Sequence, residues 1–71
     1  METPGAGYWI RFEDVDGDIV EDAVQVDYLP EVGALLPIRG THYEIMEEWI
    51  DRSFVPEGGP EIVVFTVKPL V

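Results

Sequence analysis

The chain has 71 residues, a length that allows one small domain. Fifteen acidic residues against four basic ones give a formal net charge of -11. This charge disfavours direct binding to nucleic acid or to an anionic membrane, because both kinds of partner are bound through Lys and Arg. The chain is nevertheless 46% hydrophobic, so we expect it to fold rather than to stay disordered.

Residue types that support common catalytic and metal sites are scarce. The chain has no cysteine and one histidine, His42, which excludes a disulfide, a thiolate zinc site and a histidine zinc site within one chain. A pair of carboxylates could make a hydrolase, but many such pairs exist and a domain of this size offers little room for a pocket. We therefore expect a protein that is not an enzyme, with no cofactor and no metal, in the cytoplasm.

In chain order, residues 1–7 are predicted to be a flexible lead-in and residues 8–71 a single β-rich domain. Residues 8–12 and 19–29 have strand-like patterns, and Asp16-Gly17 between them is typical of a hairpin. A three-residue loop, 16–18, with Gly17 at positive φ keeps the apolar side chains on one face. The register that follows pairs Tyr8 with Val26, Ile10 with Val24, Asp14 with Val20 and Val15 with Ile19.

A short third strand is expected over residues 34–38, at an edge or with a bulge because of Pro37. Residues 42–53 fit two structures. As a helix, they place Ile45, Met46, Trp49 and Ile50 in one stripe. As a strand, they suit the short turn at Gly40, and we favour this alternative. Trp49 is predicted to lie in the core in both cases.

Residues 56–60 have the composition of a loop. Residues 62–67, Ile-Val-Val-Phe-Thr-Val, are the clearest strand in the chain. Apolar residues occupy both parities of this strand, so we expect it to be central in the sheet or buried on both faces.

Several positions together resemble the small SH3-like β-barrels found in bacteria, phages and mobile elements. The similarity lies in Leu29-Pro30-Glu31-Val32-Gly33, followed by Ile38, Gly40 and Tyr43-Glu44-Ile45. The closing stretch, residues 62–70, is similar to the last strand of such barrels. The resemblance implies a mainly β fold, a five-stranded SH3-like barrel, and the role of a binding module. If residues 42–53 are a helix, the fold becomes α+β, with that helix packed on an antiparallel sheet.

The candidate functional surface is the first hairpin. Trp9 lies on the parity opposite the expected core, where it either stays exposed for a partner or packs beneath a loop, the second alternative being slightly favoured. Ten of the fifteen acids lie in two stretches, one on this hairpin and one over residues 44–51. We expect a protein partner, with a basic surface, to bind through Trp9, Glu13, Asp14, Asp16, Asp18, Glu21 and Asp22.

Three alternatives remain open for the acidic surface and for assembly. The acids could serve only to keep the protein soluble, an explanation that deserves the greater weight. They could instead imitate nucleic acid, so that a phage or mobile-element protein blocks a nucleic-acid-binding host protein. A homodimer could form through an exposed edge or through the apolar residues flanking Pro37.

Overall fold

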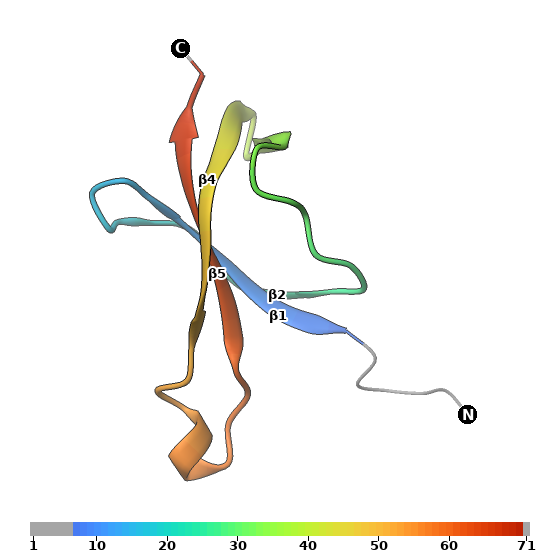
Figure 1. The fold of residues 1–71 in the computed structure, drawn as a ribbon, viewed down its shortest axis with the longest axis vertical. Helices are drawn as coiled ribbons and strands as arrows, with labels where there is room; N and C mark the ends of the chain where they lie inside the picture. Colours follow the sequence, from blue (N-terminus) through green and yellow to red (C-terminus); the bar gives the residue numbers. More distant parts are fainter. Residues whose placement is uncertain (1–6, 71) are drawn as a thin grey trace.

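The structure is a computed structural model that describes residues 7–70. The prediction of a flexible lead-in over residues 1–7 falls, except for Gly7, outside that range. Five strands form one mixed sheet in the order β2-β1-β5-β4-β3, and this sheet curls into a half-barrel (Figure 1). The strands are β1 (Tyr8–Asp14), β2 (Ile19–Val26), β3 (Leu35–Ile38), β4 (Thr41–Asp51) and β5 (Ile62–Pro69), with a short 3-10 helix, η1 (Val55–Glu57), before β5.

This architecture confirms the mainly β fold and is consistent with a small SH3-like barrel. Residues 42–53 do not form a helix, since β4 runs through residue 51 and pairs with both β3 and β5. β5 is the central strand, parallel to β1 and antiparallel to β4. Its position explains why both of its faces are apolar: Val64 on one face and Phe65 on the other are fully buried.

The core lies on the inner face of the half-barrel. Phe12 of β1 and Phe65 of β5 are paired in the sheet, and their ring centroids are 5.8 Å apart. Strand alternation brings the other buried members of this cluster to the same face. They are Ile10, Ile38, Ile45, Val63 and Val67.

The first hairpin follows the predicted register only at its open end. Tyr8 pairs with Val26 and Ile10 with Val24, as expected. Two register shifts then change the pairing, so that Phe12 lies opposite Glu21 and Glu13 opposite Ile19. The predicted pairs Asp14–Val20 and Val15–Ile19 are therefore wrong. Each shift inserts an extra residue on β2 and bends the hairpin.

The tip of this hairpin is organised by Asp14. Its backbone N–H donates to the carbonyl oxygen of Asp18 at 2.8 Å and encloses three residues, 15–17, so the loop has the predicted length but lies one position earlier than 16–18. One of its carboxylate oxygens accepts from the backbone N–H groups of Asp16 and Asp18 at 2.9 and 3.0 Å. Gly17 has a φ of 90°, which confirms the expected left-handed position.

A bulge in β4 changes the direction of its second half. The pairing with β5 shifts between Ile45 and Glu47, which leaves Met46 unpaired. Ile45 lies opposite Val67 on the inner face, whereas Trp49 lies opposite Val64 on the outer face. Trp49 is 43% exposed, so the prediction that it belongs to the core is wrong. Without the bulge, strand alternation would place it on the side of Ile45.

Candidate functional site

The outer face of the half-barrel has a regular arrangement of side chains over three strands. Along β5 the outward residues are Ile62, Val64 and Thr66, and each has one neighbour on β1 and one on β4. Adjacent strands lie about 4.8 Å apart, so these neighbours form a compact patch. We call the three outward residues of β5, together with their six neighbours on β1 and β4, the outer patch. Trp9 and Asp51 flank Ile62, Arg11 and Trp49 flank Val64, and Glu13 and Glu47 flank Thr66.

Two tryptophans lie diagonally across the outer patch. Trp9 of β1 is 37% exposed and Trp49 of β4 is 43% exposed. Between them, Ile62 and Val64 are buried although they face outward. The side chains of the patch therefore cover an apolar strip of β5 while each indole keeps part of its surface in water. Trp9 is therefore exposed, and the slightly favoured alternative, that it packs beneath a loop, is wrong.

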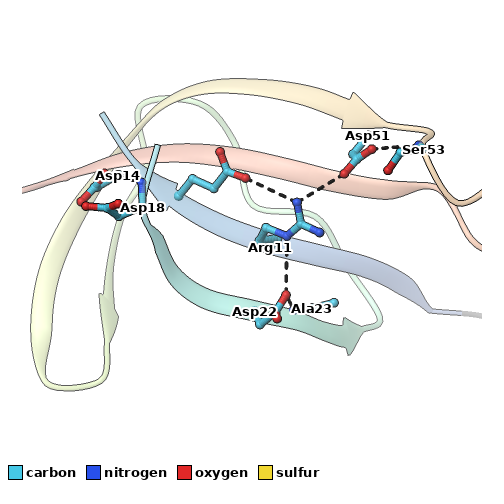
Figure 2. A network of polar contacts seen from close by, with 8 residues as sticks. Arg11, Asp14, Asp18, Asp22, Ala23, Asp51 and Ser53 are labelled. Atoms are coloured by element: carbon cyan, nitrogen blue, oxygen red, sulfur yellow. Dashed lines mark hydrogen bonds and ion pairs between the residues drawn. The ribbon is translucent and has the colours of Figure 1, made fainter. Parts of the chain in front are cut away.

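Arg11 is the centre of the polar contacts in this patch (Figure 2). Its side chain starts on β1 and crosses β5, and one terminal nitrogen, Nη1, contacts both Asp51 of β4 at 3.3 Å and Glu13 at 3.4 Å. All three side chains are largely withdrawn from water, with 13 to 18% exposure. Contacts of this kind are stronger than exposed ion pairs because water screens them less.

A third carboxylate approaches Arg11 from the other side. Asp22 of β2 lies 3.5 Å from the Nε atom and is 74% exposed. This contact is electrostatic only, because the Nε atom is buried without a hydrogen-bond partner among the described residues. One guanidinium thus faces three carboxylates, and the cluster keeps a net negative charge.

The predicted binding residues separate into three places. Trp9, Glu13 and Asp22 gather around Arg11 in or beside the outer patch. Asp14, Asp16 and Asp18 form the hairpin tip, where the carboxylate of Asp14 is used to hold the loop. Glu21 lies opposite Phe12 and contacts Arg39, directly after β3, at 3.6 Å.

Of the outer patch, sequence reasoning predicted only Trp9 and Glu13 as binding residues. Arg11, Trp49 and Asp51 were not among the predicted binding residues, and the structure places all of them there. One signal was present in the sequence: Arg11 is the only basic residue before position 39, and it shares its strand parity with Trp9 and Glu13. Nothing in the local pattern indicated Asp51, which is 40 positions away.

The pKa of Asp51 is lower than its ordinary value of 3.8. Hydrogen bonds from the Ser53 side chain and from the Ser53 backbone N–H, the latter at 2.9 Å, are the main causes. Burial acts in the opposite direction, and Arg11 adds to the lowering. These contacts stabilise the charged form of the carboxyl at the end of β4.

We expect this lowered pKa to appear as acid sensitivity. A carboxyl with a lowered pKa in the folded state stabilises the fold above pH 3.8, and that contribution disappears as the pH falls through the lowered value. Asp51→Asn should therefore be less stable than the wild type at neutral pH, and the difference should vanish in strong acid. Urea unfolding of both proteins at neutral pH and in strong acid measures this difference in stability. In an NMR titration, the Asp51 midpoint should lie below 3.8, and Ser53→Ala should raise it; a wild-type midpoint at or above 3.8 would contradict the expectation.

Two kinds of feature are absent from residues 7–70. No three His, Cys, Asp or Glu side chains are grouped so that they could hold a metal ion. No helix in this range is long and apolar enough to cross a membrane. Comparison with protein families, curated proteins and solved structures found no match.

Proposed function

We propose that this protein is a non-enzymatic binding module whose outer patch engages a basic surface of a protein partner. The observation that supports this proposal most directly is the pair of part-exposed tryptophans, Trp9 and Trp49, on one face around the carboxylates that meet at Arg11. Tryptophan contributes large contact areas in interfaces and attracts cations to its ring face. Carboxylates beside it favour partners that carry Lys or Arg.

The charge of the whole chain supports the same kind of partner. A net charge of -11 on 71 residues draws basic proteins toward the molecule over long range and speeds their association. The narrower alternative, imitation of nucleic acid, has less support. It rests on charge alone and gives no role to Trp9 and Trp49, which are part-exposed on the same face.

A pull-down from a lysate of the source cells tests the proposal. A specific partner should bind the wild type and elute as salt is raised, because salt screens the attraction between charges. Trp9→Ala and Trp49→Ala should each weaken the purified complex by about 2 kcal/mol, or roughly 30-fold. Val32→Ala is the matched control, since Val32 is 54% exposed and lies outside the patch.

Two outcomes would count against this surface. The first is retention of every captured protein by the variant that carries both tryptophan substitutions. The second is binding that does not respond to salt, because it would remove the role of the carboxylates. Trp9→Ala and Trp49→Ala should each keep the wild-type far-ultraviolet circular dichroism spectrum, so that a lost interaction can be separated from a lost fold.

A further inference from the structure

The inner face of the half-barrel has an apolar groove of about 370 Å³ between β2 and β3. The connection between these strands, residues 27–34, bounds one end of the gap. At the other end, the Glu21–Arg39 ion pair joins β2 to the residue after β3. Among residues 7–70, no charged side chain lines the groove. Its lining consists of Ile10, Phe12, Val24, Val26, Tyr28, Pro30, Ala34, Leu35 and Leu36.

The groove lies where a complete barrel would have paired strands. β2 and β3 are the two ends of the sheet and do not pair with each other, so each has one edge without a neighbouring strand in the described structure. The two edges are not equivalent. β3 has four residues, and Pro37 among them has no N–H to donate, whereas β2 has eight residues and no proline. β2 is therefore the better edge for an added strand, over residues 24–26, where it pairs with β1 without the register shifts that bend its first part.

Charge decides which occupant suits this edge. Glu21 and Asp22 lie on β2, and Asp27 follows it directly. The side chain of Asp22 is 74% exposed on the outer side of the sheet. A second copy of this chain, with its own net charge of -11 and the same acids at this edge, would be repelled. A strand with basic side chains would instead be attracted.

From this geometry we infer that the half-barrel binds an extended peptide segment of a partner protein, in which apolar and basic residues alternate. The segment adds to the free edge of β2. Alternate side chains of a strand point to opposite faces, so its apolar residues enter the groove and its basic residues face outward near Asp22. This site is on the opposite face from Trp9 and Trp49, and the inference does not depend on the function proposed for them.

Defined peptides test the inference. The probe is a fluorescein-labelled heptapeptide of alternating Lys and Val, blocked at both ends, and fluorescence anisotropy reports its binding. Two matched peptides replace every Val by Ser or every Lys by Glu. We expect the Lys/Val peptide to bind at least about tenfold more tightly than either, because only it combines groove filling with complementary charge. Equal binding of the Lys/Ser peptide would show a purely electrostatic association and would overturn the inference, as would failure of the Lys/Val peptide to bind.

Variants locate the binding to the groove. Tyr28 and Leu35 line it and are 67% and 61% exposed, so replacing both by Ser changes the groove with little effect on the core. This variant should bind the Lys/Val peptide about tenfold more weakly. Val32→Ser, exposed but outside the groove, should bind as the wild type does. Unchanged binding by the Tyr28/Leu35 variant would exclude the groove.

Hydrogen exchange and sedimentation complete the test. If the peptide pairs with β2, amide exchange of β2 should slow when peptide is added, because free edge groups gain hydrogen-bond partners. Acceleration or no change there would exclude strand addition. A concentration-dependent dimer that the Tyr28/Leu35 substitutions dissociate would assign the groove to a second copy and overturn the peptide as its occupant.

Discussion

Replacing Phe65 with alanine is expected to lower the free energy of unfolding by about 3–5 kcal/mol, the usual cost of removing a buried aromatic ring. Phe65 is fully buried on the central strand, and its ring packs against Phe12. A domain of 71 residues is expected to have a total stability of only about 4–10 kcal/mol. Loss of one ring should therefore remove a large share of the stability, and urea unfolding followed by tryptophan fluorescence measures it.

The matched control for this substitution is Phe54→Ala. Phe54 is 43% exposed and precedes η1, so its removal should cost less than about 1 kcal/mol. If Phe65→Ala does not fold, Phe65→Leu keeps most of the volume and should lose about 1–1.5 kcal/mol. Equal losses from Phe65→Ala and Phe54→Ala would contradict the packing described for the inner face.

The central position of β5 could be predicted from the sequence because burial on both faces leaves a continuous apolar run. Val63 and Val64 illustrate this point: they point to opposite faces, and both are buried. The edge position of β3 could also be predicted from the sequence, since Pro37 lacks the N–H that a central strand needs. In both cases the information lies in a few adjacent residues.

The structure of β4 was harder to predict because a bulge imitates helical spacing. Ile45 and Ile50 both lie on the inner side, opposite Val67 and Val63, although they are five positions apart. A regular strand cannot place residues an odd number of positions apart on one face, whereas a strand with one extra residue can. The resulting pattern fits a helix, and it also led to the wrong placement of Trp49. The bulge depends on the pairing with β5, which local sequence does not contain.

The contacts of Arg11 show the same limit for the candidate site. Its neighbour Glu13 is two positions along the same strand and could be expected from alternation. Asp51 reaches Arg11 only because β4 and β1 flank β5, an arrangement set by the order of strands in the sheet. Strand alternation thus placed Trp9 on the face opposite the core, but it predicted neither the exposure of its side chain nor the polar network beside it.

Arg11→Met is expected to lower the free energy of unfolding by about 1–3 kcal/mol at low salt. Methionine can replace the apolar stem of the arginine over β5, but it leaves Glu13, Asp22 and Asp51 without their shared cation. Those carboxylates then repel one another, two of them with little access to water. Because salt screens repulsion at the accessible positions, the loss should shrink as ionic strength rises. Urea unfolding at low and high salt gives both values.

Arg52→Met is the matched control, since Arg52 contacts Glu61 at 3.0 Å with both side chains well exposed. It should change stability by less than about 0.5 kcal/mol. Adding Asp51→Asn to Arg11→Met should restore part of the lost stability, because it removes one of the repelling charges. Replacing the cation alone is costly because its partners stay charged; removing charge from both sides relieves that cost. Equal stability of the Arg11 and Arg52 variants at low salt would show that Arg11 does not stabilise the outer patch through its charge.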